Sequence, residues 1–245
     1  MAARLCLAIF GCWLAIIAPS LYAAELKAKP VTIELGEKTS VETLELENSG
    51  AAPVRVQLRL FSWTQAGRQD QLEPTRDIVA NPGIFEISPG SAQTIRIGRL
   101  IGPASAEKSY RLFIDQIPDN RPADGGEVKV LLRLSLPIFV APSNASSQLE
   151  WRIWPAGPNR LAVAITNNGN AHAKLHSVQV STASGDKGKY EGLLYVLPGA
   201  TRSISLPIDM KVMIGQQIKI VAGTDNGDSS AEPKIEAAPH AESLD

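Results

Sequence analysis

The sequence predicts an all-β protein made of two immunoglobulin-like β-sandwich domains. Three observations support this prediction. Short runs rich in Val, Ile, Leu and Thr alternate with clusters of Gly, Pro, Asn and Asp along most of the 245 residues. No segment of useful length has the period of an amphipathic helix. The pattern of strands and turns also occurs twice, and turn signals between closely spaced strands are typical of immunoglobulin-like sandwiches.

Six strands are expected in the first half of the chain. Each is rich in β-branched or aromatic residues and ends at a turn signal. They cover residues 41–48, 54–63, 84–88, 93–100, 110–117 and 128–140. Residues 119–127 (DNRPADGGE) are expected to form a loop before the last of them.

Six more strands are expected in the second half, over 149–155, 160–167, 173–181, 192–198, 202–208 and 216–224. The small and polar residues 141–147 mark the boundary, so we predict domains at 24–142 and 147–227. Residues 228–245 are mostly small, polar and charged. This composition predicts a disordered tail.

Two turn signals occur in both halves. The tripeptide NSG at 48–50 is echoed by NNG at 167–169, an offset of 119 residues from Asn48 to Asn167. SPG at 88–90 is echoed by LPG at 197–199, an offset of 109 residues from Pro89 to Pro198. Both offsets are about one domain length, and we therefore interpret the halves as related sandwiches.

The N-terminus has the layout of a secretory signal peptide. One Arg precedes an apolar run from Leu5 to Ile17, and the small residues Ala23 and Ala24 follow. A membrane anchor is the competing interpretation, but the run is shorter than the roughly 20 apolar residues that span a bilayer. We predict a signal peptide over residues 1–23 and no membrane insertion.

Removal of the signal peptide changes both the cysteine content and the charge. Cys6 and Cys12 are the only two cysteines, so the mature chain has neither disulfide nor thiol chemistry. Loss of Arg4 moves the formal net charge from −1 to −2. This balance gives no reason to expect nucleic acid as a partner.

No motif indicates a metal, a cofactor or an enzyme. His172 and His176 are four residues apart, but on a strand this places them about 13 Å apart. Acidic residues near Gly227 resemble a calcium loop only loosely and predict a turn instead. Nucleophile, P-loop and dinucleotide motifs are absent from the sequence.

The three tryptophans of the mature chain are assigned to the sandwich cores or to a contact between the domains. A role in stacking against carbohydrate is the alternative. They are Trp63, Trp151 and Trp154.

Residues 127–140 (EVKVLLRLSLPIFV) carry an unusually long row of large apolar side chains. In an extended chain, alternate residues share one face. That face holds Val128, Val130, Leu132, Leu134, Leu136 and Ile138. Alternation alone does not decide whether the row covers the protein's own core or another protein, because any sandwich strand can alternate in this way.

At this point the sequence resembles the periplasmic pilus chaperones of the chaperone–usher pathway. A W-x-Q and D-x-x-x-x-P pattern between Trp63 and Pro82 is most similar to the archaic branch, whose subunits resemble spore coat protein U. The stretches that carry the resemblance are 61–98, 110–118, 127–142, 167–175, 194–199 and 223–228.

The resemblance implies an L-shaped pair of immunoglobulin-like domains that works in the periplasm without a cofactor. Pilus subunits of this pathway lack their last strand, and the chaperone fills the gap with its own edge strand. An outer-membrane usher then receives the subunit. By position, the donor side chains are Val128, Val130, Leu132, Leu134 and Leu136. Their burial would contribute roughly 7–15 kcal/mol before association costs. An exposed edge also makes a self-capped homodimer plausible.

The resemblance fails at the site where many members anchor the carboxyl terminus of the subunit. The Arg and Lys of that anchor correspond to about Val31 and Pro137, and neither can pair with a carboxylate. Candidate replacements are Arg96, Arg133 and Lys29. A structural salt bridge for Arg96 and a solvated strand position for Arg133 are the alternatives.

The resemblance also implies an interdomain charge network of Glu, Arg and Asp, but this sequence matches the network only in part. Glu107 and Asp225 match two of its members, whereas Ala141 occupies the place of the Arg. Arg111 or Arg96 is expected to substitute.

The alternative function is that of a secreted β-sandwich binding module, either a pilus subunit or an adhesin. A subunit needs an N-terminal extension of alternating apolar residues. After cleavage this chain begins AELKAKPVTIEL, where alternation starts only at about Val31. The sequence therefore favours the chaperone.

Overall fold

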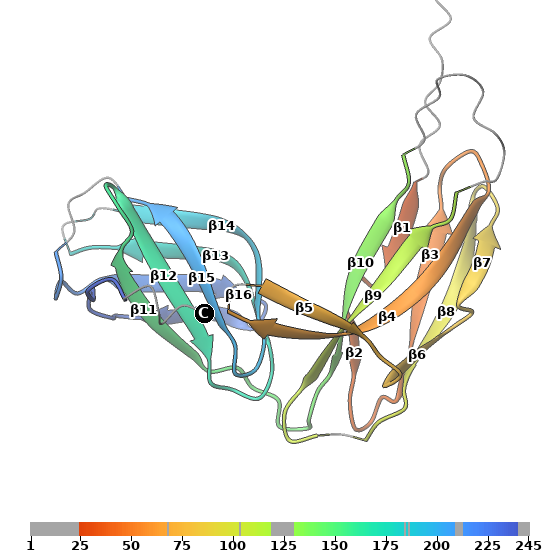
Figure 1. The fold of residues 1–245 in the computed structure, drawn as a ribbon, viewed down its shortest axis with the longest axis horizontal. Helices are drawn as coiled ribbons and strands as arrows, with labels where there is room; N and C mark the ends of the chain where they lie inside the picture. The colour runs from red at the N-terminus through yellow and green to blue at the C-terminus, as the bar shows by residue number, and fades with distance from the viewer. Residues whose placement is uncertain are drawn as a thin grey trace, which may run out of the picture.

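The computed structural model describes residues 25–239 except residues 68, 103, 119–129, 184, 186 and 209–212. Figure 1 shows two β-sandwiches that meet at an angle as two arms. The described residues contain strands, turns and bends but no helix. Among them, therefore, no helix could cross a membrane. The predicted all-β fold with two sandwich domains is confirmed.

Ten strands form the described part of the first domain. They are β1 (Leu26–Lys29), β2 (Ile33–Leu35), β3 (Val41–Asn48), β4 (Val54–Ala66), β5 (Gln69–Pro74), β6 (Ile78–Asn81), β7 (Ile84–Ile87), β8 (Ser91–Arg99), β9 (Lys108–Gln116) and β10 (Arg133–Val140). One sheet has the order β1-β3-β8-β6. The other has the order β2-β10-β9-β4-β5, and β7 also pairs with β4.

Seven strands occur among the residues that the structure describes in the second domain. They are β11 (Leu149–Pro155), β12 (Arg160–Asn167), β13 (Ala173–Ser181), β14 (Lys187–Val196), β15 (Thr201–Pro207), β16 (Lys219–Thr224) and β17 (Gly227–Ala231). The two sheets have the orders β11-β12-β15 and β14-β13-β16-β17. Each domain has its own apolar core between its sheets.

The repeated turn signals form the same structure in both domains. Asn48 and Asn167 are fully buried, and each side-chain amide donates two hydrogen bonds to backbone carbonyls of neighbouring turns. The N–H of Gly90 donates to the carbonyl of Asn48 at 2.8 Å, and the N–H of Gly199 donates to that of Asn167 at 2.8 Å. Both glycines have positive φ angles of 67° and 73°, which glycine adopts without steric cost. The internal repeat is therefore confirmed at the level of individual hydrogen bonds.

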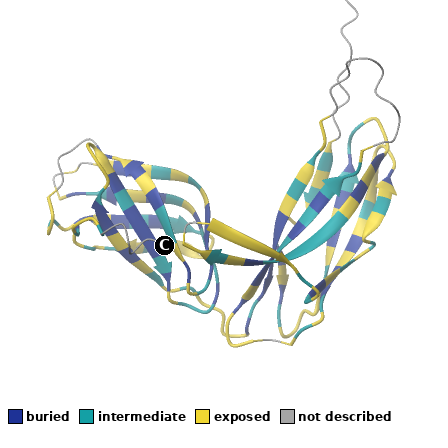
Figure 2. Ribbon diagram, viewed as in Figure 1, coloured by how far each residue is buried: buried dark blue, intermediate teal, exposed yellow. Residues whose placement is uncertain are grey.

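The predicted strands of the first half all occur, but four further strands were missed. β1, β2 and β6 are only three or four residues long, which is too short for periodicity to reveal. β5 is exposed throughout (Figure 2). It forms because β4 continues to Ala66 and turns back on itself as a hairpin.

The predicted disordered tail is wrong over residues 228–239. Residues 227–231 form β17, which pairs with β16 through a two-residue turn at Asp225 and Asn226. Ile235 is fully buried in the core of the second domain. The short, polar sequence of β17 concealed it, because an edge strand needs few apolar residues. The predicted turn near Gly227 is confirmed, and residues 240–245 lie outside the described part.

Candidate functional site

The N-terminal half of β10 has one unpaired edge. On its other edge β10 pairs with β9 along its whole length in antiparallel register. β2 pairs only with the last three residues, Ile138 to Val140. Within the described ranges, residues 133–137 therefore have no strand beside them on that edge. This open length corresponds to about 17 Å of backbone, whose outward N–H and C=O groups can pair with an added strand.

The edge of β1 faces the same side of the sandwich. β1 is the terminal strand of the four-stranded sheet, and residues 30–32 carry the chain from it into β2 of the other sheet. Because this link is so short, β1 and β10 flank one side of the domain (Figure 1). Leu26, Ala28 and Leu134 pack there against the core but are only partly buried. The core is thus incompletely covered on the β1–β10 side.

The side chains of the predicted donor row are exposed at one end of the row and buried at the other. Val130 is 76% exposed, and Leu132 is half-buried. Leu134 packs against the domain's own core, and Leu136 belongs to that core with 7% exposure. Val128 lies outside the described residues. The predicted strand over 128–140 begins at Arg133 in the structure, because β9 ends opposite this point and nothing described pairs with residues 130–132 as a strand.

Arg133 is paired with a carboxylate in this structure. Asp115 lies opposite Arg133 in the β9–β10 register and accepts hydrogen bonds from Arg133 and, at 2.7 Å, from Nε of Arg59. Both guanidinium groups also lie within 6 Å of the Phe113 ring centre, a favourable cation–π arrangement. Burial acts to raise the pKa of Asp115, but the two arginines outweigh it and the pKa lies below its usual range.

Arg96 and Lys29, the other candidate anchors, are both exposed. Arg96 lies in β8 opposite Thr43 and Asn81, on the outer face of the four-stranded sheet. Lys29 ends β1. Neither has an ion pair with any described residue.

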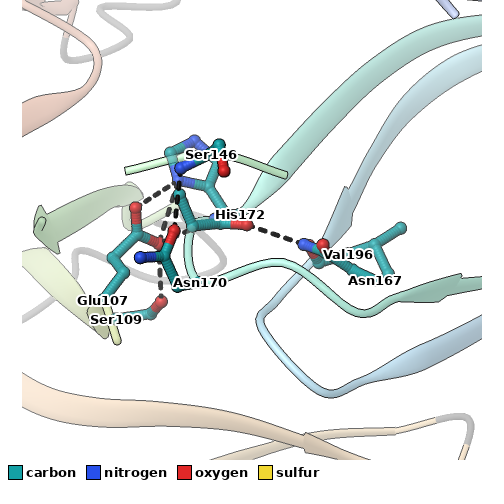
Figure 3. A network of polar contacts seen from close by, with 8 residues as sticks. Glu107, Ser109, Ser146, Asn167, Asn170, His172 and Val196 are labelled. Carbon is teal, nitrogen blue, oxygen red and sulfur yellow. Dashed lines mark hydrogen bonds and ion pairs between the residues drawn. The ribbon is translucent and has the colours of Figure 1, made fainter. Parts of the chain in front are cut away.

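Glu107 crosses to the second domain and meets His172, not Asp225 (Figure 3). The Nδ1 atom of His172 lies 2.9 Å from each carboxylate oxygen, and the backbone N–H of His172 donates to the same carboxylate at 3.2 Å. The Glu107 side chain is only 2% exposed. Asn170 adds a backbone contact, since its carbonyl accepts from the N–H of Glu107 at 2.8 Å.

Aromatic rings surround this hydrogen-bonded pair. The imidazole of His172 stacks on Phe139 of β10 with ring centres 3.5 Å apart. Phe139 packs in turn with Trp63 of the first domain and Tyr195 of the second in one buried cluster. The C-terminal end of β10 therefore packs against the second domain by stacking, beside the hydrogen bonds that join Glu107 to His172.

Asp225 does not join the predicted interdomain network. Its carboxylate lies 2.8 Å from Nζ of Lys174 and 2.9 Å from Nε2 of His176, both in the second domain. The hydrogen bond from Lys174 to Asp225 raises the pKa of Lys174. Asp225 and Glu107 thus belong to separate contacts, because His172 fills the role beside Glu107 that the resemblance assigned to an Arg.

The β4–β5 hairpin supplies a second bridge between the domains. The side-chain amide of Gln65 donates to the carbonyl of Tyr195 at 3.1 Å and accepts from the N–H of Leu197 at 3.0 Å. Asp70 of β5 pairs with Arg202 at 3.3 Å. The hairpin thus extends beyond its own sheet and contacts the second domain (Figure 1).

Sequence reasoning missed His172 and Gln65 as domain contacts. His172 was considered only as a metal ligand with His176, and among the described residues no group of three or more His, Cys, Asp or Glu is arranged to hold a metal. Gln65 stood within the W-x-Q pattern, which was a usable signal. Trp63 lies at the domain contact, and Trp151 lies in the second core, as the sequence allowed.

A cavity of about 400 Å³ lies between the domains, and its ionisable groups are engaged with one another. The hydroxyl of Tyr110 donates to Asp77 at 2.8 Å, and Nζ of Lys108 lies 3.7 Å from the same carboxylate. Burial, followed by the hydrogen bond to Asp77, raises the pKa of Tyr110. All three groups belong to the first domain, and their arrangement offers no activated nucleophile.

Comparison with protein families gives one match. Residues 25–146 match the family described as "Pili and flagellar-assembly chaperone, PapD N-terminal domain". No curated protein sequence matches the chain.

Solved structures of similar fold cover nearly the whole chain. The complex of the chaperone CsuC with the tip adhesion subunit CsuE, from archaic chaperone–usher pili of Acinetobacter baumannii, contains a chain that is 22% identical with a TM-score of 0.64. The match covers 88% of this chain and 100% of that one. For the YadV chaperone the values are 16%, 0.61, 85% and 99%. For the Salmonella enterica complex of the SafA pilin with the SafB chaperone they are 20%, 0.59, 89% and 99%. At these identities the likeness establishes the fold.

Proposed function

This chain belongs, through its N-terminal domain, to the family of pili and flagellar-assembly chaperones, and from this premise we propose that it binds pilus subunits by donating the open edge of β10. The bound subunit gains the strand that it lacks, and backbone hydrogen bonds supply much of the affinity. One observation carries the proposal. Among the described residues, the N-terminal half of β10 is unpaired on one edge, and exposed apolar residues precede it.

The proposed contact surface is the β1–β10 side of the first domain. Val130 and Leu132 project beyond the protein's own core, and together with Val128 they are the side chains that would fill the subunit. Leu134 is shared between the two cores. Leu136 packs mainly in the core of the chaperone's own first domain. The row of side chains proposed to enter the subunit is therefore shorter than the sequence predicted. Burial of Val130 and Leu132 would contribute roughly 1.5–3 kcal/mol each before association costs.

Two structural relatives support this partner class. CsuC was solved with a tip adhesion subunit in a pre-assembly complex, and SafB was solved in complex with the SafA pilin. By analogy the present protein holds a pilus subunit and passes it to an outer-membrane usher. When free, it would cap the same edge with a second copy of itself.

This function requires export, in keeping with the proposed signal peptide at residues 1–23 and a periplasmic location. Membership of this family also implies that the protein neither forms nor breaks covalent bonds in the subunit that it holds. Holding and releasing a subunit needs only exchange of one strand for another.

The interdomain contact supports a fixed angle between the two arms. We assign Glu107 and His172 to this role in place of a Glu–Arg–Asp network. Lys29 and Arg96 remain the candidates for binding a carboxylate at the subunit's end, because each is exposed and unpaired among the described residues. Arg133 is a weaker candidate, since Asp115 already neutralises it.

The test replaces Val130 and Leu132 together by Asp. A tagged pilus subunit is co-expressed with the chaperone, and the amount of chaperone that co-purifies with the subunit is measured. We expect the complex to be lost while the urea unfolding midpoint stays close to that of the wild type, because these side chains contribute little to the chaperone's own core.

The matched control is Ile214→Asp, which changes an exposed apolar residue of the second domain. It should leave recovery of the complex unchanged. Undiminished recovery with the double variant would remove the proposal.

A further inference from the structure

Leu132, the residue just before β10, is held by both of its backbone polar groups. The backbone N–H of Gln116, which ends β9, donates to the carbonyl of Leu132 at 2.9 Å. The N–H of Leu132 donates to the side-chain oxygen Oε1 of the same glutamine at 3.1 Å. In a regular antiparallel ladder, two opposite residues exchange both hydrogen bonds through their backbones. Here the side chain of Gln116 supplies one of the two acceptors, so pairing with β9 continues one residue beyond the end of β10.

The described residues just before Leu132 lack this support. Val130 and Leu131 are exposed and lie outside any strand, and no described residue accepts a hydrogen bond from their N–H groups. On the other side of Leu132, the side chain of Arg133 is hydrogen-bonded to Asp115 of β9. The side chain of Gln116 therefore holds the last backbone position at which the donor segment is still fixed to β9.

These hydrogen bonds also determine which backbone groups face the open edge of β10. Because Leu132 bonds to β9, the N–H and C=O of Arg133 point the opposite way, and those of Ser135 do the same. The far end of the strand agrees, since the N–H of Ala141 donates to β2 at 2.9 Å on that edge. Pro137 has the same parity but carries no N–H. Within the open part of β10, an added strand therefore finds its donors at Arg133 and Ser135.

We propose that Gln116 is a positioning residue that orders the start of the donor strand before a subunit binds. Its side chain keeps Leu132 extended, so that the leucine side chain stays in the donor row and the backbone groups of Arg133 point toward the open edge. A segment that is already extended loses less conformational entropy on binding. The inference deepens the proposed function, on which it rests, and it assigns Gln116 a role that is exerted through Leu132.

Amide hydrogen exchange in the wild-type protein is the first test. In the free protein, the Leu132 amide should be roughly tenfold better protected than the Leu131 amide, because only the former has an acceptor among the described residues. When the tagged pilus subunit is bound, the amides of Arg133 and Ser135 should gain protection, whereas that of Leu132 should change little. Equal protection of Leu131 and Leu132 in the free protein would overturn the proposal, whatever the variants do.

Gln116→Met and Gln116→Glu test the side-chain acceptor at nearly constant size. The first removes the acceptor, whereas the second keeps an oxygen at the end of a side chain of the same length. The tagged subunit is diluted from urea into excess chaperone, and formation of the complex is followed with time. Gln116→Met should lower the protection of the Leu132 amide and slow this capture by roughly two- to tenfold, the range expected for one hydrogen bond.

Gln116→Glu should restore both the protection of the Leu132 amide and the rate of capture. Gln57→Met, the same change at an exposed glutamine of β4, is the control and should capture the subunit as the wild type does. The proposal fails if Gln116→Met captures the subunit at the wild-type rate, even with a lower urea midpoint, since that result assigns the glutamine to stability alone. It also fails if Gln116→Glu is as slow as Gln116→Met.

The result can be told apart from that of the proposed function. If the wild type forms no complex with the subunit, the proposed function itself fails. If the wild type forms the complex and Gln116→Met forms it equally fast, only the role of Gln116 is lost. If the Gln116→Met protein does not fold, the exchange pattern of the wild type decides.

Discussion

The two halves of β10 share one alternating sequence but have opposite surroundings. At the C-terminal half, Ile138 to Val140 pair with β2, and Phe139 stacks on His172 of the second domain. At the N-terminal half the same edge is open, and Val130 just before the strand is largely exposed. The difference arises from the length of β2, which covers three residues and then ends. A short neighbour, and not a special sequence in β10, leaves this edge without a partner strand among the described residues.

The largest effect expected from this comparison is on stability at Leu136. Leu136→Ala removes a side chain from the first core and should lower the free energy of unfolding by about 2–5 kcal/mol. Val130→Ala, the matched change in the exposed segment, should stay within about 0.5 kcal/mol of the wild type. Urea unfolding of both variants provides the measurement. Equal losses would mean that the two halves do not differ in the free protein.

Much of this architecture could be predicted from residues alone. The β periodicity, the repeated Asn-x-Gly and Pro-Gly turns and the two cores follow from local sequence, because each reflects contacts within one sheet or turn. The position at which a neighbouring strand ends cannot be predicted in this way. β2 has three residues, and the sequence of residues 128–140 does not indicate where β2 ends.

The domain contact was less predictable for a related reason. Glu107 was identified, but its partner His172 lies 65 positions away and was considered for a different chemistry. Arg111 was named only as a possible substitute in the charge network. In the structure its guanidinium instead lies 3.7 Å from the Trp63 ring centre, a three-dimensional arrangement that spacing does not reveal.

A second prediction concerns the fixed end of β10. Glu107→Gln keeps the size of the side chain but removes the charge that faces His172, and should cost about 1–3 kcal/mol because the pair is buried. We expect a lower thermal midpoint and a broader distribution of arm angles in small-angle scattering.

The matched control for that change is Glu236→Gln. Its carboxylate lies 2.7 Å from Arg152, but both of these side chains are about half exposed. Such pairs contribute little, so this variant should behave as the wild type does. A Glu107→Gln protein with unchanged midpoint and scattering would show that the aromatic stacking and the β4–β5 hairpin fix the arms without the charge of Glu107.

The smallest effect is expected at the open end, where Asp115 lies opposite Arg133. The pKa of Asp115 is lowered in the folded protein, so its ionised form stabilises the fold at any pH above the usual Asp value of about 3.9. This contribution is lost as pH falls through the lower, folded pKa. Asp115→Asn should therefore cost about 1 kcal/mol or less at pH 7, since both arginines are substantially exposed. The difference in stability from the wild type should shrink near pH 3.

Urea midpoints at pH 7 and pH 3 measure this difference, with Asp228→Asn as an exposed control. A difference that grows on acidification would have the wrong sign and would show that the two arginines do not hold the Asp115 carboxylate in its ionised form.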